Sequence, residues 1–408
     1  MKPKPKSIAI VGGGPAGLRV AEILSAQGYG VALFDQKSSV GRKFLIAGRG
    51  GLNITHSEPM DRLSRRYFSE TSPQLLSTMH QALLRFSSSD LRAWVESFGI
   101  ETYVGSSGRV FPVGDTAAKL LMAWVDRLKK QGVIFFLKHS WKELQRTDSG
   151  WKLTFEFESE RREETFDGVV FAMGGGSWKE TGSDGAWVDR FRELGIIVNP
   201  FTPANCGWEV DWEPWFLEKF EGKPLKGVEV WCDGFEKEKI RGDLMVTKDG
   251  LEGTPIYTLT RTLRKLAAPR LHLDLKPDLS KEVLRERFKT RHGFLKDLEK
   301  GWKLSPIAKA VLLRGNPERD LDVFIHRIKD CPIELKGSRP LEEAISSAGG
   351  VSEASLTDAG MLRDYPGCFT VGEMNDWEAP TGGYLLQGCL SSASMIAEGL
   401  CDYLSPPQ

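Results

Sequence analysis

The order of apolar and polar positions predicts alternating strands and helices at the start of the chain. An apolar run at Ser7–Val11 predicts a strand, Gly14–Gln27 has the pattern of a helix, and Gly30–Asp35 predicts a second strand. Together these segments predict a compact β-α-β unit. A polar, glycine-rich loop is expected to follow from Gly41 to Glu58.

The next part of the chain adds helices and a small antiparallel sheet. Helices are expected near Asp90–Phe98 and Asp115–Gln131, and the second leads into an apolar strand at Val133–Leu137. Three alternating segments separated by turn residues predict a β-meander: Trp141–Thr147, Trp151–Phe157 and Glu163–Phe166. Val169–Met173 is continuously apolar and precedes three glycines, as expected for a buried parallel strand.

The composition changes after Pro200 and changes back near Pro340. Residues 200–339 contain tryptophan-rich and basic stretches, and we expect them to form an inserted domain. Its predicted elements are strands at Val228–Cys232 and Leu271–Leu275 and helices near Lys281–Glu299, Ser305–Arg314 and Pro317–Asp330. Residues 340–408, with a final helix near Leu385–Tyr403, are expected to rejoin residues 1–199 in the first domain.

Charge and composition narrow the class of protein. The chain has 55 Lys and Arg against 55 Asp and Glu, which argues against extended binding to nucleic acid without excluding a local basic groove. No apolar run approaches the roughly 20 residues that span a membrane, and the apolar stretch after MKPKPK is too short for a signal peptide. The six cysteines and six histidines show no metal-ligand spacing. We therefore expect a cytoplasmic protein with reduced thiols and without a metal site.

The strongest chemical signal is a glycine motif between the first strand and the first helix. Gly12, Gly14 and Gly17 form GxGxxG, which allows a tight turn, close approach of a pyrophosphate and close packing of helix on strand. The helix N-terminus adds N–H groups and a partial positive charge. Asp35 ends the second strand, where a carboxylate can bind both ribose hydroxyls of adenosine and disfavours NADP. The motif predicts a site for FAD or NAD.

Several features favour FAD over NAD and point to a family. They are the segment GPAGL, the β-meander and the late pair Gly372–Glu373. The matching segments are GGGPAGL (12–18), VGRKFLIAGRGGLNITHSE (40–58), GRVFPVGDTAAKL (108–120), FAMGGGSWKETGSDGAW (171–187), GLEGTPIYTL (250–259), SSAGGVS (346–352) and CFTVGEMNDWEAPTGGYLLQGCLSSA (368–393). Through them the chain resembles the glutathione-reductase-like flavoproteins, and among them the bacterial BaiN/YhiN-like, or aminoacetone-oxidase-like, FAD-binding family.

The resemblance implies an α/β fold. It consists of a Rossmann-type FAD domain with a β-meander, made from both chain ends, and an inserted α+β domain with a small β-barrel and a helical part. Two departures lie near the expected flavin site. The family's usual Arg-Cys-Asn is here Gly51-Leu52-Asn53, and its usual tryptophan after TGGYNLQ is Gly388, followed by Cys389.

The expected cofactor contacts follow from the motifs and the resemblance. A cationic loop at Arg42 and Lys43 could face adenosine or pyrophosphate, and the small residues of 48–53 would let backbone approach the isoalloxazine ring. The resemblance implies that Glu373 holds ribitol hydroxyls, and a helix N-terminus at the flavin pyrimidine edge would stabilise the charge formed on reduction. The expected FAD-binding residues are Gly12, Gly14, Pro15, Ala16, Gly17, Asp35, Gln36, Lys37, Arg42, Lys43, Asn53, Ala172, Met173, Gly174, Gly372, Glu373, Gly382, Gly383, Tyr384 and Leu385. A rival interpretation makes Gly174–Ser177 a nicotinamide-nucleotide fingerprint.

Catalytic side chains are much less evident in the sequence. His56 is a weak acid-base candidate, and a structural role is the alternative. Cys389 has no partner cysteine for disulfide chemistry, so packing is the favoured interpretation. Packing is also favoured over an aromatic substrate wall for Trp208, Trp212, Trp215 and Trp231. The turn at Gly253–Ile256 could begin a helix facing the flavin or be a simple loop.

The sequence predicts an FAD-dependent oxidoreductase that transfers a hydride or electron pair through flavin N5 to or from a small molecule. NAD(P)H is a possible reductant, and neither the substrate nor the oligomeric state is predicted. The alternatives are an amine oxidase, a flavin-dependent RNA-modifying enzyme and a flavin sensor. The neutral charge balance disfavours the RNA-modifying alternative.

Overall fold

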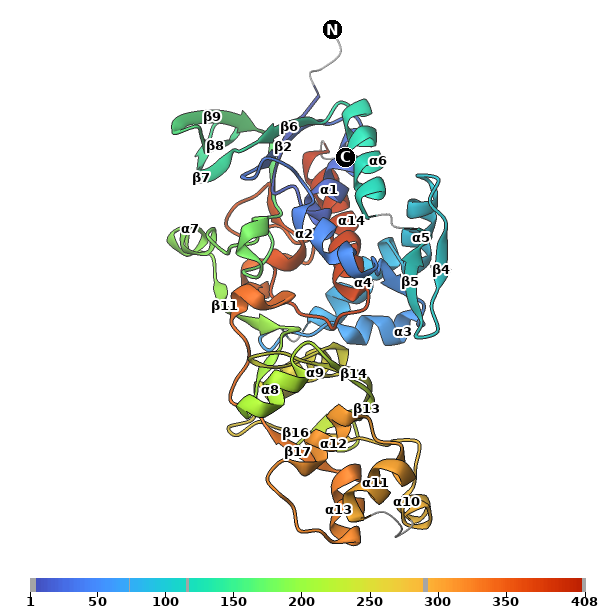
Figure 1. Cartoon of the computed structure of the whole chain (residues 1–408). Coiled ribbons are helices and arrows are strands. Elements are labelled where there is room, and N and C mark those ends of the chain that lie inside the picture. The colour runs from blue at the N-terminus through green and yellow to red at the C-terminus, as the bar shows by residue number, and fades with distance from the viewer. Residues whose placement is uncertain (1–4, 73, 115–116, 289–292, 406–408) are drawn as a thin grey trace. The chain divides into compact units, whose positions relative to one another are not determined.

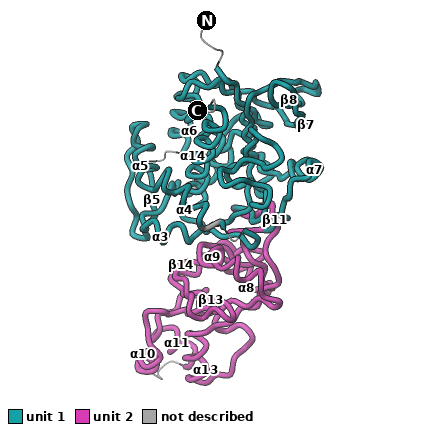
Figure 2. The backbone as a smooth tube through the Cα atoms, turned by 180° about the vertical axis from the view of Figure 1, so that it is seen from behind, with its two compact units in different colours: residues 1–202, 346–408 teal, residues 203–345 magenta. Residues whose placement is uncertain are grey.

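The computed structural model describes residues 5–72, 74–114, 117–288 and 293–405. The chain divides into two compact units, one formed by residues 1–202 and 346–408 and the other by residues 203–345 (Figure 2). The inserted domain expected from the sequence was residues 200–339, so the limits of the second unit differ from it by three and six residues. Within the described part of the chain, no helix is long and apolar enough to cross a membrane.

The first unit is built around a five-stranded parallel sheet (Figure 1). Its strands, in spatial order, are β19 (Cys368–Thr370), β10 (Gly168–Phe171), β1 (Ser7–Val11), β2 (Gly30–Asp35) and β6 (Ile134–Leu137). Val11 pairs with Phe34 on one side and with Phe171 on the other, so these strands end together at one edge. Ligands of such sheets bind outside the carboxyl ends of the strands. The predicted Rossmann-type fold is confirmed.

Both faces of the parallel sheet are covered. On one face, Ile8 and Ile10 are fully buried in the core shared with α1 (Pro15–Ala26), α6 (Ala117–Lys130) and α14 (Tyr384–Leu404). Helices α1 and α14 lie side by side (Figure 1). The other face carries the predicted meander: β7 (Ser140–Thr147), β8 (Gly150–Phe157) and β9 (Glu160–Phe166). Phe34 stacks there on Phe155, with ring centroids 3.9 Å apart. Burial on two sides explains the continuously apolar strands.

The first unit also contains short helices and two small sheets. Its other α-helices are α2 (Arg42–Ala47), α3 (Met60–Leu63), α4 (Leu75–Arg85), α5 (Ser88–Glu96) and α7 (Val188–Glu193). An antiparallel sheet has the order β3 (Thr55–His56), β5 (Arg109–Pro112) and β4 (Thr102–Val104), and β11 (Val198–Ala204) pairs with β18 (Ser346–Val351). Helix α5 begins with a capping box between Ser87 and Asp90, which satisfies two backbone donors of its first turn.

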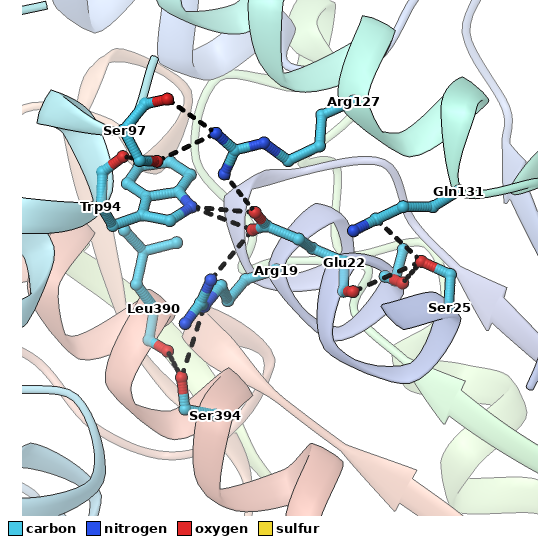
Figure 3. Close-up of polar contacts among 10 residues, drawn as sticks. Arg19, Glu22, Ser25, Trp94, Ser97, Arg127, Gln131, Leu390 and Ser394 are labelled. Carbon is cyan, nitrogen blue, oxygen red and sulfur yellow. Dashed lines mark hydrogen bonds and ion pairs between the residues drawn. The ribbon is translucent and has the colours of Figure 1, made fainter. Parts of the chain in front are cut away.

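A buried carboxylate fixes α1 against two neighbouring helices (Figure 3). Glu22 of α1 accepts hydrogen bonds from Arg19 at 2.9 Å and from Arg127 of α6 at 2.9 Å. The indole N–H of Trp94 in α5 donates to the same carboxylate at 3.0 Å. Only 8% of the Glu22 side chain is exposed, so its charge depends on these partners. The cluster therefore holds the helix whose N-terminus carries the glycine motif.

The second unit is an antiparallel barrel with a helical part. Its strands run in the order β12 (Trp208–Glu209), β15 (Gly250–Glu252), β14 (Ile240–Val246), β13 (Pro224–Cys232), β16 (Arg270–Asp274) and β17 (Cys331–Glu334). The segment after β17 returns to β12, since Glu209 N donates to Gly337 O at 2.8 Å and Arg339 N to Gly207 O at 2.8 Å. The sheet thus closes on itself. The helices are α8 (Pro214–Phe220), α9 (Thr254–Leu263), α10 (Lys281–Arg287), α11 (Phe294–Trp302), α12 (Pro306–Leu313) and α13 (Leu321–Lys329).

Several expectations about local structure were wrong. The predicted loop at Gly41–Glu58 contains α2, which starts at Gly41 because a φ of +66° turns the chain there. The predicted helix Lys281–Glu299 is two helices, α10 and α11, with Gly293 at a φ of +98° before the second. Residues 289–292 of that predicted helix lie outside the described part of the chain. The same holds for residues 115–116, where the helix that corresponds to α6 was expected to start. Helix α4 was not predicted.

Candidate functional site

A deep pocket opens at the carboxyl edge of the parallel sheet, where α1 begins. The space that it encloses amounts to about 1040 Å³ when the open solvent at its mouth is included. Twelve of the residues predicted to bind FAD line it: Gly12, Gly14, Pro15, Ala16, Asp35, Gln36, Arg42, Lys43, Ala172, Met173, Gly174 and Glu373. The pocket therefore brings the glycine motif, Asp35 and the cationic loop together.

The three glycines of the motif are glycines for different reasons. A Cβ at Gly12 would lie 2.3 Å from the carbonyl oxygen of Ala172, and one at Gly17 would lie 2.0 Å from that of Gly12. The packing of the protein's own backbone therefore requires glycine at both positions. A Cβ at Gly14 would meet no protein atom within 4 Å. The space beside Gly14, at the N-terminus of α1, is thus left open to the pocket, which is where an anionic ligand is favoured.

Asp35 lies at the end of β2 with its carboxylate held by backbone N–H groups. Gly13 N donates to Oδ2 at 2.8 Å, and Lys37 N donates to Oδ1 at 2.7 Å. Burial raises the pKa of Asp35, although these amide hydrogen bonds act in the opposite direction. Each carboxylate oxygen still has a free lone pair, so the group can accept hydrogen bonds from ribose hydroxyls.

An ion pair among the lining residues joins α2 to the segment that follows β19. Lys43 Nζ donates to Glu373 Oε2 at 2.8 Å and to Ser177 Oγ at 2.9 Å. Arg42 also lines the pocket, and its buried Nε has no partner among the described residues. These groups bring two cations into the lining of the pocket, which also contains the N-terminus of α1. The chemistry suits phosphate and sugar hydroxyls.

The far end of the pocket contains residues that sequence reasoning missed. His139, Ser140 and Trp141 come from the start of the meander, and residues 181–184 come from the loop after β10. Gln36 Nε2 bridges the two sides of this end by donating to Gly182 O at 2.9 Å. No local motif marks these residues. They could have been found only by recognising that the carboxyl ends of β2, β6 and β10 meet at one edge of the parallel sheet.

The remaining predicted residues do not line this pocket. Gly17 packs within the first turn of α1, Lys37 packs against Gly182, and Gly372 lies beside Ala16 and Cys389. The others lie around the start of α14 and in the loop before β3: Asn53, Gly382, Gly383, Tyr384 and Leu385.

The start of α14 is pressed against β3. A Cβ at Gly383 would lie 2.6 Å from backbone atoms of Thr55, and Gly383 has a φ of +96°. The buried atoms Asn53 Oδ1 and Thr381 Oγ1 have no hydrogen-bond partner in the described part of the chain. Unsatisfied buried acceptors are rare in native proteins. Together with the open space at Gly14, they fit a polar ligand that spans both regions, as FAD would.

His56 is occupied by the backbone. Its Nδ1 accepts from Glu58 N at 3.1 Å, which leaves Nε2–H to donate to Ser107 O at 3.0 Å. Because both ring nitrogens have backbone partners, the structure favours the structural alternative over acid-base catalysis. The ring also stacks on Tyr384, with centroids 5.3 Å apart.

Tyr384 lies in a network of ionisable groups. Its hydroxyl interacts with Glu58, which accepts two hydrogen bonds from Arg66, at 3.0 and 2.8 Å. Burial and Glu58 raise the pKa of Tyr384. Despite partial burial, hydrogen bonds from Arg66 and Tyr384 lower the pKa of Glu58. Tyr384 is therefore protonated and Glu58 ionised at neutral pH.

The cysteines have no redox partners. All six are free, and the described residues contain no group of His, Cys, Asp or Glu that could hold a metal ion. Burial raises the pKa of Cys389, which makes its thiol unreactive. At Gly388, a Cβ would lie 2.6 Å from Tyr67 and 2.9 Å from Trp377, so these rings fill the space of the family's usual tryptophan.

Comparison with known proteins agrees with this geometry. The HI0933-like protein Rossmann domain family matches residues 6–399. The chain belongs to this family. It is 25% identical to the 3-dehydro-bile acid delta(4,6)-reductase of Clostridium scindens, over 93% of this chain and 95% of that protein. It is 26% identical to the ribosomal RNA dihydrouridine synthase of Escherichia coli, over 96% and 97%.

Solved structures share the fold at low sequence identity. The 3-ketosteroid-Δ4-(5α)-dehydrogenase of Rhodococcus jostii matches with a TM-score of 0.50 and 13% identity, over 99% of each chain. A flavocytochrome c3 fumarate reductase matches with a TM-score of 0.50 and 13% identity, over 98% of this chain and 79% of that one. Family and fold together identify this member of the HI0933-like family as an FAD-dependent oxidoreductase.

Proposed function

We propose that the pocket at the N-terminus of α1 holds the adenosine and pyrophosphate of FAD. The open space beside Gly14 is the observation that carries this proposal, because no protein atom explains the glycine there. Asp35 would accept hydrogen bonds from the ribose, and the first-turn N–H groups of α1 would bind the pyrophosphate. Lys43 and Glu373 would hold phosphate and ribitol hydroxyls.

The flavin end would reach the start of α14 and the loop before β3. Asn53 and Thr381 would supply polar contacts there, and the N-terminus of α14 would favour negative charge. Tyr384 would lie beside this edge, held by His56, Glu58 and Arg66. Bound FAD supplies the acceptance and donation of a hydride at N5.

The proposed reaction is the reduction of a C=C bond conjugated to a carbonyl in a small molecule, with NAD(P)H as the reductant. The names of two relatives support a reduction: one is a delta(4,6)-reductase of a bile acid, and the other is a dihydrouridine synthase, which is named for ribosomal RNA and not for a small molecule. No specific observation favours an amine oxidase or a sensor. The Tyr384 hydroxyl and two N–H groups of Arg66 already bind Glu58, so the remaining guanidinium N–H groups of Arg66 are the donors that a carbonyl oxygen would use there.

The test begins with the visible spectrum of the purified protein and continues anaerobically with NADH and NADPH. We expect a bound flavin that bleaches with one of them, and then recovers on addition of an α,β-unsaturated ketone. Flavin that bleaches only with amines would replace the proposal by an amine oxidase. Absence of flavin after incubation with FAD would overturn the placement of the cofactor.

A further inference from the structure

One face of the small sheet β3-β5-β4 carries aromatic and cationic side chains. Arg109 and Phe111 are two residues apart in β5, so they project from the same face. Directly opposite them in the neighbouring strands are His56 of β3 and Tyr103 of β4, which share that face. Val110, on the other face, is fully buried, whereas Tyr103 is 51% exposed and the rest of this face is partly buried. We call His56, Arg109, Phe111 and Tyr103 the aromatic face.

The two rings of the aromatic face lie nearly parallel to one another. The ring centroids of Tyr103 and Phe111 are 5.5 Å apart, and the ring planes differ by 21°. Flat conjugated rings pack on such a pair in offset stacks. Because half of Tyr103 is open to solvent, a ligand can reach this surface without displacing the core.

Two glycines border the aromatic face. A Cβ at Gly51 would lie 3.8 Å from Cε1 of Phe111, and one at Gly382 would lie 3.2 Å from Nε of Arg109. Both glycines have a positive φ, +102° and +117°, which other residues rarely adopt. Because neither glycine carries a side chain, the backbone passes close to Phe111 and Arg109 without covering them.

The same two segments carry the polar atoms that were assigned above to the flavin end. The buried atoms Asn53 Oδ1 and Thr381 Oγ1, which have no hydrogen-bond partner among the described residues, lie two residues after Gly51 and one residue before Gly382. Each segment therefore contacts the aromatic face within two residues of an atom that awaits a polar ligand. A substrate on this face would lie beside the region proposed for the flavin ring.

Arg109 brings a second guanidinium, besides that of Arg66, to the surroundings of Tyr384. Its Nε and the Cε2 atom of Tyr384 flank the same point, at 3.2 and 3.5 Å from a Cβ at Gly382. A guanidinium has five N–H donors and keeps its charge, so it can bind a carbonyl oxygen in addition to any group of the protein. Negative charge that develops on this oxygen during a reduction would be stabilised there.

We propose that Tyr103, Phe111 and Arg109 bind the substrate, and that the substrate is a free small molecule whose flat conjugated ring bears a carbonyl group. The ring would stack on the pair of Tyr103 and Phe111, and the carbonyl oxygen would accept hydrogen bonds from Arg109. A single guanidinium beside two aromatic rings complements one carbonyl oxygen, whereas an RNA strand needs a row of cations along its phosphates. The inference names the substrate class of the site and rests on the function proposed above.

The test measures binding to the purified, flavin-loaded protein. The probes are coumarin, a flat ring with a carbonyl group next to a double bond, and naphthalene, which has similar rings and no carbonyl group. Both are measured by equilibrium dialysis, and a short uridine-rich RNA with a fluorescent label is measured by anisotropy.

Each variant has a matched control. Tyr103→Leu is compared with Tyr403→Leu, because Tyr403 is also in the first unit and is 41% exposed. Arg109→Met is compared with Arg162→Met, because Arg162 also lies over an aromatic ring, 4.4 Å from the centroid of Phe157. Flavin content and thermal unfolding check that each variant folds. Arg109→Lys, which keeps the charge but loses the planar donors, replaces Arg109→Met if that variant does not fold.

We expect Tyr103→Leu to bind coumarin and naphthalene about fivefold more weakly, because both stack on the ring. Arg109→Met should bind coumarin about tenfold more weakly and naphthalene as the wild type does, because only coumarin has an oxygen to accept the hydrogen bond. A purely structural role of Arg109 would weaken both probes alike. The two controls should bind as the wild type does.

Three results would overturn the inference: no binding of coumarin to the wild type, equal affinity of all variants for both rings, or binding of the RNA alone. These results are distinct from a failure of the proposed function. If the variants change coumarin binding as expected but the wild type reduces no unsaturated ketone, the binding face is supported and the proposed reaction fails. If the ketone is reduced while all variants bind coumarin equally, the reaction stands and this inference fails.

Discussion

Gly14 offers the most direct test of where the cofactor binds. The residue is the N-cap of α1, with φ −77° and ψ 178°, a conformation that any residue adopts. Replacing it with valine would place a side chain in open space, because a Cβ at this position would have no protein atom within 4 Å. The fold should therefore accept the change, while a ligand in that space should not.

The expected magnitudes separate the two effects. An unfavourable N-cap residue costs about 1 kcal/mol of stability. A pyrophosphate displaced from the helix N-terminus loses at least two charge-assisted hydrogen bonds, of about 1.5–3 kcal/mol each. A loss of about 3 kcal/mol or more corresponds to roughly a 100-fold or greater loss of FAD affinity. The substitution should therefore reduce FAD affinity much more than it reduces the stability of the fold.

The assay measures flavin content after purification and the FAD dissociation constant of the apoprotein by fluorescence quenching. Urea unfolding of the apoprotein gives the stability of each variant. Gly337→Val is the matched control, because its Cβ would also meet nothing within 4 Å but lies in the second unit. If Gly14→Val retained flavin with wild-type affinity, the pyrophosphate would not lie at the N-terminus of α1.

Three further predictions test other parts of the structure. Glu22→Ala should lower the free energy of unfolding, measured in urea, by about 3–5 kcal/mol, because it leaves its buried partners unpaired. The control Glu398→Ala, in the exposed ion pair with Arg85, should lower it by less than about 1 kcal/mol. Burial raises the pKa of Cys206 and Cys331 from 9.0 to about 11, so stability present below pH 9 should be lost as the pH rises toward 11, by up to about 2.7 kcal/mol per thiol. A flat unfolding free energy over that range would contradict this. Lys43→Ala should weaken FAD binding about tenfold, because the loss of the ammonium group leaves the Glu373 carboxylate facing the phosphates. Glu373→Gln should weaken FAD binding less. Equal FAD dissociation constants for the two variants would refute the assigned roles.

The sequence predicted best those elements whose signals agree at several levels. The bounds of β1 and β2 match the prediction, because an apolar run, a glycine turn and a terminal acid all mark the same segments. Helix α14 was found within a residue or two for the same reason. Helix α2 was missed because glycine and charge in Gly41–Glu58 are typical of a loop, whereas Gly41 starts a helix there. Composition cannot distinguish a glycine that ends a helix from one that starts it.

The site residues that lie close together in the sequence were predicted, whereas those that only the fold brings together were missed. The turn at Gly12–Gly17 and Asp35 belong to one β-α-β unit, so spacing alone brings them together. His139 and Gly182 reach the same pocket from the meander and from the loop after β10. Only the strand order of the parallel sheet makes them neighbours. A single sequence does not specify that order, since it depends on long-range packing.

The glycine motif combines positions that have different physical causes. Gly12 and Gly17 are fixed by clashes with the protein's own backbone, so their presence reports on the fold and says little about a ligand. Gly14 has no such reason, and it alone of the three carries information about what binds. The functional signal therefore lies in the glycine whose presence the folded protein does not itself explain.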